Sequence, residues 1–159
     1  MNKKYYLAYG SNLSVEQMAY RAPDAELIGK AVLRDWRLLF KTHADIEECH
    51  GYETPVLVWL ISEQDEKRLD RYEGWPKYYI KKNLSVTVTP FNSGERFECG
   101  AMVYVMAKNF KRAQPMKEYY KLLETGYERF NFDKNILYKA LYESVTPCEF
   151  SRGFEVSLI

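Results

Sequence analysis

Two short turns hold the residue types best suited to binding an anion and moving a proton. The first is Gly10-Ser11-Asn12, which interrupts an apolar run that begins at Tyr6 and precedes a helical pattern marked by Ser14 and Gln17. A strand that enters a tight turn before a capped helix leaves backbone N–H groups unpaired, and such groups attract anions. The sequence therefore predicts that this turn holds a carboxylate.

The second turn contains Glu73, directly before Gly74 at the end of a short predicted helix. The negative end of the helix dipole and the apolar neighbours Tyr72 and Trp75 both disfavour an ionised carboxyl group. The pKa of Glu73 should therefore rise, which suits a general acid/base near neutral pH. By itself, a glutamate before a helix-terminal glycine is more often a solvated surface residue. Together with the first turn and the 14 tyrosines of the chain, Glu73 favours a site for an amino-acid-like ligand.

Composition narrows the class of protein. A chain of 159 residues suits one compact domain, and its 23 lysines and arginines nearly balance 22 aspartates and glutamates. Such a chain has no net field to attract nucleic acid or an anionic membrane. No apolar run approaches the ~20 residues that span a bilayer, and the first residues lack the apolar segment of a signal peptide. Three widely spaced cysteines argue against a disulfide scaffold. We therefore expect a cytoplasmic monomer or homodimer that binds a small molecule and neither nucleic acid nor a membrane.

The pattern of apolar and polar residues predicts a series of strands and helices. Strands are expected at 4–9, 31–41, 56–61, 78–89 and 99–107, and helices at 14–20, 63–71, 116–130 and 134–143. Ser14 and Gln17 have the spacing of a capping box, and Ser62 and Asp133 are expected to cap later helices. The polar residues 42–54 are expected to form a loop. These elements favour an α+β fold, with a mixed, mainly antiparallel sheet or barrel and helices packed around it.

Two other segments carry weaker expectations. Residues 1–144 are assigned to one domain, and residues 145–159 to an extension of unknown role that forms either a last edge strand or a flexible arm. His43, Cys49 and His50 share one polar segment but lack a second pair of ligands. Solvated loop residues are therefore favoured there over a metal site.

Several short motifs resemble those of the γ-glutamylcyclotransferases. Their order and spacing make the likeness specific, and it covers roughly residues 5–143. The motifs are Tyr9-Gly10-Ser11-Asn12, Gly29-Lys30-Ala31-x-Leu33, Arg37-Leu38-x-Phe40, Leu69-Asp70-x-x-Glu73-Gly74, Tyr79, Ala101-x-Val103-Tyr104-Val105, Pro115-x-x-x-Tyr119 and Gly126.

The resemblance implies a small mixed barrel and an intramolecular acyl transfer that needs neither a metal nor an organic cofactor. A γ-glutamyl group would cyclise to 5-oxoproline and release the amine to which it was attached, with Glu73 as general acid/base. The remaining roles are expectations. The backbone at Gly10, Ser11 and Asn12 would bind the substrate carboxylate, Asn12 either contacting the ligand or, more plausibly, bracing the turn. Tyr9 would support the cavity wall, Tyr119 would donate a hydrogen bond to substrate, and Tyr79 and Tyr104 are further candidates. A register error of one residue would exchange Tyr79 for Tyr78 or Tyr119 for Tyr120.

The chain departs from the family pattern in one strand, where Val58-Trp59-Leu60 stands in place of a common glycine. Trp59 either narrows the cavity or packs away from it, so acceptance of a large substrate such as glutathione is left open. Two alternative functions also stay open. One is a binding domain on the same scaffold without catalysis, and the other is a relative in which water or a second amine replaces the internal nucleophile.

Overall fold

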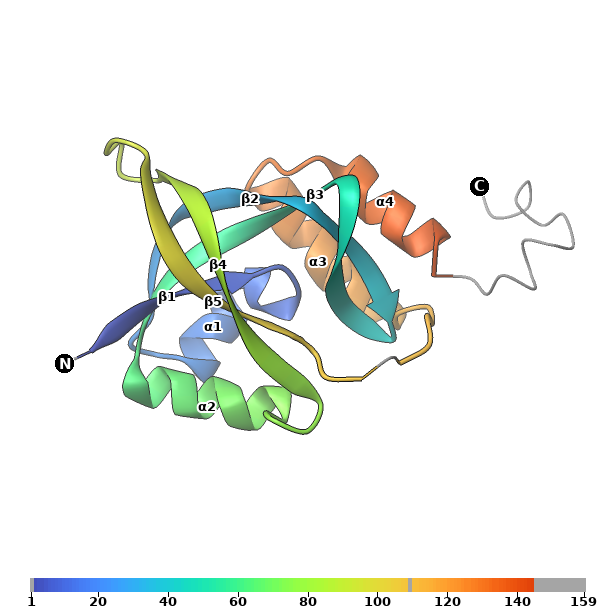
Figure 1. The fold of residues 1–159 in the computed structure, drawn as a ribbon, viewed down its shortest axis with the longest axis horizontal. Helices are drawn as coiled ribbons and strands as arrows, with labels where there is room; N and C mark the ends of the chain where they lie inside the picture. The colour runs from blue at the N-terminus through green and yellow to red at the C-terminus, as the bar shows by residue number, and fades with distance from the viewer. Residues whose placement is uncertain (1, 109, 145–159) are drawn as a thin grey trace, which may run out of the picture.

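A five-stranded closed barrel forms the centre of the computed structural model, which describes residues 2–108 and 110–144 (Figure 1). The strands follow the order β1-β3-β2-β4-β5 around the barrel. Their bounds are β1 Lys3–Ala8, β2 Glu26–Lys41, β3 His43–Ser62, β4 Tyr79–Pro90 and β5 Phe97–Met106. Every neighbouring pair is antiparallel except β1 and β5, which run parallel and close the barrel. The predicted α+β class and the mainly antiparallel barrel are confirmed.

The prediction of a loop at residues 42–54 is wrong, because this segment forms the first part of β3. Thr42 turns the chain with a positive φ of 70°, and Lys41 then faces His43 across the hairpin. Ala44, Asp45 and Ile46 are buried, while the residues that follow are mostly polar and partly exposed. These polar residues lack the alternation that predicts a strand. They form one because β2 pairs with them and supplies their backbone hydrogen bonds.

Four α-helices and one short 3-10 helix surround the barrel. The helices are α1 Val15–Arg21, α2 Glu63–Glu73, α3 Lys117–Arg129 and α4 Lys134–Tyr142, and the 3-10 helix η1 is Ser11–Leu13. Helices α1 and α2 pack together below β1 in Figure 1, whereas α3 contacts η1 and α4 packs on β2. No helix among the described residues is long and apolar enough to cross a membrane.

The helix caps explain where these elements begin. Ser14 accepts a hydrogen bond from the Gln17 N–H, but Oε1 of Gln17 is buried without a partner among the described residues. The expected capping box at α1 is therefore only half formed. Ser62 and Asp65 complete a reciprocal capping box at α2, and Asp133 caps α4 as predicted. Residues 145–159 lie outside the described residues, so the edge strand or arm expected there stays a prediction.

Close packing of α3 fixes the turn that follows β1. A Cβ atom built on Gly126 of α3 would lie 2.8 Å from Cβ of Leu13, which is closer than side chains tolerate. Leu13 is 1% exposed, so it has little room to move away. Only a glycine at this position lets α3 approach η1 closely enough to hold the turn at residues 10–13.

Gly126→Ala should therefore destabilise the protein. Overpacking of a buried contact costs ~1–3 kcal/mol, whereas alanine recovers only about 1 kcal/mol of helix propensity. We expect a net loss of about 1 kcal/mol in the free energy of unfolding, measured by urea denaturation. Gly100→Ala is the matched control, since a Cβ there meets nothing within 4 Å. Equal stability of the two variants would contradict the packing argument.

Candidate functional site

One cavity of about 590 Å³ opens between the η1 turn, the end of α2 and the first residues of β3. Its floor is buried and rich in tyrosine, and its rim is exposed. All eight predicted site residues line it. They are Tyr9, Gly10, Ser11, Asn12, Glu73, Tyr79, Tyr104 and Tyr119. The two turns, some sixty residues apart in the chain, thus meet at one hollow.

Asn12 braces the first turn. Its side chain is 2% exposed, Nδ2 donates to the Tyr6 hydroxyl at 2.9 Å, and Oδ1 accepts from Arg21 at 2.7 Å. Arg21 also donates to Oγ of Ser11 at 2.9 Å. With its oxygen and one amide hydrogen already used, Asn12 holds the turn in shape. The backbone N–H groups at residues 10–12 have no hydrogen-bond acceptor within the described part of the chain.

Glu73 is the last residue of α2, and it lines the same cavity. Gly74 follows with φ 69° and ψ 34°, a left-handed conformation that ends the helix and that glycine adopts without strain. Burial raises the pKa of Glu73 to about 7, and the positive charge of Arg21 opposes this rise. The carboxyl group is therefore divided between its acidic and basic forms near neutral pH.

Trp75 was expected to form part of the apolar environment of Glu73, but it lies outside the cavity. It is 43% exposed and does not line the cavity. The ammonium group of Lys81 instead lies over its indole ring at 4.0 Å. Tyr72 does line the cavity, and its ring is stacked by the guanidinium of Arg21 at 3.5 Å.

Tyr119 and Tyr79 bind the two backbone polar groups of one residue in β3, Ala44. The Tyr119 oxygen accepts the Ala44 N–H at 3.0 Å, and the Tyr79 hydroxyl donates to the Ala44 carbonyl at 3.0 Å. Because the Tyr119 oxygen acts as acceptor here, its own O–H is free to donate to a ligand. Burial raises the pKa of Tyr119, which keeps that proton in place at neutral pH.

The lining of the cavity separates Tyr119 from Tyr120 but includes both Tyr78 and Tyr79. Tyr119 lines it, whereas Tyr120 packs against Phe40 and its buried hydroxyl has no partner among the described residues. Tyr78 and Tyr79 both line it, with Tyr79 inside and Tyr78 at the exposed rim.

Tyr9 and Tyr104 belong to the cavity wall. The Tyr9 hydroxyl donates to the Tyr104 carbonyl at 2.6 Å, and the Tyr104 hydroxyl donates to Asp70 at 2.6 Å. Asp70 is in turn paired with Lys81 at 2.9 Å. Both hydroxyl protons are therefore committed to the protein, which favours a supporting role over direct contact with a ligand.

Sequence reasoning missed Arg21 and the pair formed by Lys41 and Asp45. Lys41 Nζ lies 2.8 Å from Asp45, both side chains are buried, and Asp45 also accepts the Met106 N–H. The pairing arises across the tight turn at Thr42, which the sequence pattern did not reveal. The sequence did not indicate a role for Arg21 in the site, because an arginine in the last turn of a helix is common.

The two histidines of the polar segment, His43 and His50, lie in different surroundings. His43 lines the cavity and meets Tyr119 edge-on at 5.0 Å between ring centroids, whereas the side chain of His50 is 99% exposed. Among residues 2–108 and 110–144, no group of three or more histidine, cysteine, aspartate or glutamate side chains is arranged to hold a metal ion. Trp59 is buried and does not line the cavity, so it packs away from the site.

Comparison with known proteins identifies the family. The model described as "Gamma-glutamyl cyclotransferase, AIG2-like" matches residues 6–129. The chain belongs to this family. It is 32% identical over 133 residues to a γ-glutamylcyclotransferase of Bos taurus, which covers 76% of this chain and 68% of that protein. The human γ-glutamylcyclotransferase is 29% identical over 136 residues, with the same two coverages. A solved structure named γ-glutamyl cyclotransferase superimposes with a TM-score of 0.74 at 25% identity and covers 92% of this chain and 89% of its own.

Replacing Arg21 with glutamine should raise the pKa of Glu73 further. The arginine charge stabilises the ionised carboxylate, and glutamine removes that attraction. The measurement is an NMR titration of the Glu73 side-chain carbonyl, assigned by its disappearance in Glu73→Gln. Arg129→Gln is the control, because Arg129 pairs with Glu16 on the surface at 3.1 Å and does not line the cavity. An unchanged or lowered pKa in Arg21→Gln would show that Arg21 does not act on Glu73.

Proposed function

We propose that the protein converts a γ-glutamyl amine or γ-glutamyl amino acid to 5-oxoproline and the free amine, with Glu73 as general acid/base. The observation that carries the proposal is a carboxyl group with a pKa of about 7 that lines the same cavity as a turn whose backbone N–H groups have no acceptor within the described residues. Membership of the family and relatives named γ-glutamylcyclotransferase support the same reaction.

The reaction needs one proton carrier. The α-ammonium group of the substrate gives a proton to the Glu73 carboxylate, and the resulting amine attacks the γ-carbonyl carbon. A new C–N bond closes the five-membered ring, and Glu73 returns its proton to the departing nitrogen as the original amide C–N bond breaks. The ring nitrogen gives its second proton to the released amine, which leaves as an ammonium ion. No oxidant, reductant or second substrate enters this balance. A pKa near 7 suits both steps, because Glu73 must accept and then donate at the same pH.

Correct orientation of the bound substrate supplies much of the remaining rate acceleration. Ring closure is already unimolecular, so the protein must mainly fold the glutamyl chain back on itself, an effect worth up to roughly 7–11 kcal/mol. In the proposed pose, the backbone N–H groups at residues 10–12 bind the α-carboxylate. This places the α-amine toward Glu73, and the free Tyr119 O–H donates to a substrate oxygen. Gly10 leaves room for that pose, since a Cβ there would lie 3.1 Å from the Tyr119 hydroxyl.

Glu73→Gln should lower release of 5-oxoproline from γ-glutamyl substrates by at least about 100-fold, because glutamine cannot accept the ammonium proton. Release is measured by mass spectrometry. Glu63→Gln, at the exposed start of the same helix, is the matched control. Retained turnover in Glu73→Gln would remove Glu73 from its role. Absence of turnover in the wild type, with γ-glutamyl ligands still bound, would favour the binding domain without catalysis.

A stability measurement verifies that Glu73→Gln is folded. The pKa of Glu73 in the folded state lies above its ordinary value of 4.5, so the folded wild type holds this proton more tightly than the unfolded chain. The wild type should therefore lose stability relative to Glu73→Gln as pH rises from about 4.5 past 7. Below pH 4.5 the carboxyl is protonated in both states and the difference vanishes.

Tyr119→Phe should lower kcat/KM for the same substrates by about 10- to 100-fold, the worth of one hydrogen bond to a charged or developing charged oxygen. Tyr120→Phe is the matched control on the neighbouring residue, because its hydroxyl contacts no partner within the described residues and does not line the cavity. Equal activity of the two variants would contradict the proposed contact of Tyr119 with substrate.

A further inference from the structure

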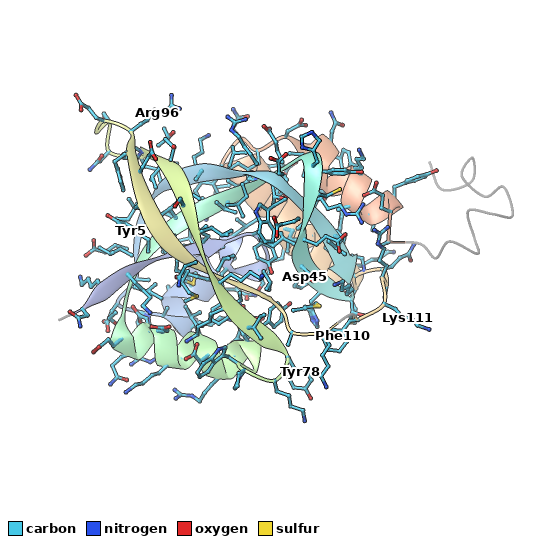
Figure 2. All side chains as sticks on the ribbon, viewed as in Figure 1. Tyr5, Asp45, Tyr78, Arg96, Phe110 and Lys111 are labelled. Carbon is cyan, nitrogen blue, oxygen red and sulfur yellow. The ribbon has the colours of Figure 1, made fainter. Side chains whose placement is uncertain are left out.

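Two exposed aromatic residues lie at the rim of the cavity. Tyr78 precedes β4, Phe110 follows β5, and both line the cavity together with Met106. Figure 2 shows Tyr78 and Phe110 projecting at the same side of the barrel, beyond Asp45. Tyr78 is 53% exposed and Phe110 is 39% exposed, so the opening is flanked by two rings that water reaches.

Tyr78 is held in place despite its exposure. A Cβ atom on Gly74 would lie 2.6 Å from Cδ2 of Tyr78, so the ring packs directly on the glycine that follows Glu73. The Tyr78 N–H donates to the Gly74 carbonyl at 2.9 Å, and its own carbonyl accepts from Ala107 at 2.8 Å. The ring therefore stands at a fixed position beside the acid/base residue.

Phe110 lies on a connection that is tied to the barrel. The Ala113 N–H donates to the Phe40 carbonyl at 3.1 Å, and the Thr42 N–H donates to the Ala113 carbonyl at 3.1 Å. These bonds hold the segment after β5 against the hairpin turn that precedes His43. Phe110 thus lines the opening from a segment that is hydrogen-bonded to the barrel.

The charges along the cavity leave the rim mostly apolar. The ionisable residues other than tyrosine that line it are Lys41, His43, Arg71 and Glu73. Lys41 is neutralised by Asp45 at 2.8 Å, and Glu73 lies inside at the end of α2. Arg71, which is exposed, is one charge at the rim, and the ammonium group of Lys77 lies 5.5 Å from the centroid of the Tyr78 ring. An anionic leaving group would meet these two cations, while a flat apolar group would meet two aromatic rings and a methionine.

We propose that Tyr78, Met106 and Phe110 form the leaving-group subsite and select γ-glutamyl conjugates whose amine carries an aromatic side chain. This inference rests on the proposed function. If the glutamyl group occupies the floor beside the η1 turn and Glu73, the substituent on the departing nitrogen must extend toward the rim. Apolar surface removed from water there favours an aromatic group over a small or charged one.

The test compares three substrates that share the glutamyl group and the carboxylate of the leaving amino acid. They are γ-glutamyl-phenylalanine, γ-glutamyl-alanine and γ-glutamyl-glutamate, with 5-oxoproline release measured for each. We expect kcat/KM for the phenylalanine conjugate to exceed that for the alanine conjugate by about tenfold, which is worth about 1.4 kcal/mol. The glutamate conjugate should not exceed the alanine conjugate. Because the phenylalanine and alanine conjugates carry the same carboxylates, Arg71 contributes equally to both, whereas the glutamate conjugate tests whether a second negative charge is favoured at the rim.

Two variants test whether the rim residues cause the preference for the phenylalanine conjugate. Phe110→Ser and Tyr78→Ser should each lower the phenylalanine-to-alanine ratio of kcat/KM by threefold or more. Phe91→Ser is the control, because Phe91 is 45% exposed but stacks on Phe130 away from the cavity, and it should leave the ratio unchanged. Thermal unfolding of each variant verifies that it is folded.

The outcomes separate the two proposals. If the wild type releases no 5-oxoproline from any of the three conjugates, the proposed function fails. If it turns over all three with a ratio near one, or prefers the glutamate conjugate, the reaction stands and the aromatic subsite is wrong. A preference for phenylalanine that persists in both serine variants would also overturn the assignment of Tyr78 and Phe110.

Discussion

The guanidinium group of Arg21 joins the two turns from which the site is built. It donates to Ser11 and Asn12 of the first turn and stacks on Tyr72, the residue before Glu73. A planar group with several fixed donors can hold both an amide and a hydroxyl while it covers a ring, which an ammonium group does less well. The side chains of Ser11 and Asn12 are therefore held by the protein, and the backbone N–H groups at residues 10–12 have no acceptor among the described residues.

The same arginine limits the electrostatic effect of burial on Glu73. Burial alone favours the protonated acid, and the nearby positive charge favours the carboxylate. The balance leaves the pKa at about 7, where one group can accept and donate a proton in the same cycle. A more exposed carboxyl group would remain ionised at neutral pH, and a more deeply buried one without Arg21 would remain neutral. Arg21 thus braces the turn at residues 10–12 and also lowers the pKa of the carboxyl group that we propose as the acid/base.

Tyrosine serves three different purposes in this cavity, and the hydrogen bonds distinguish them. The protons of Tyr9 and Tyr104 are donated within the protein, so these residues stiffen the wall. Tyr119 accepts from the backbone, and we propose that its proton is donated to a ligand. The Tyr78 hydroxyl makes no such bond within the described part of the chain, and its ring lies at the rim. A solved relative superimposes with a TM-score of 0.74, so the fold that carries the cavity is common to both chains.

The sequence by itself determined the elements with strong local signals. Gly74 ends α2 after Glu73, Ser62 begins it, and the apolar run at 56–61 is a strand, because caps and periodicity act between residues close in the chain. The motifs also indicated which residues line the site. Only the tertiary structure decided that residues 43–54 form a strand, that Trp75 lies outside the cavity and that Lys41 neutralises Asp45. It also decided that Arg21 links the two turns. Each of these depends on which segments the barrel brings together, and contacts between distant residues leave no periodic trace in the sequence.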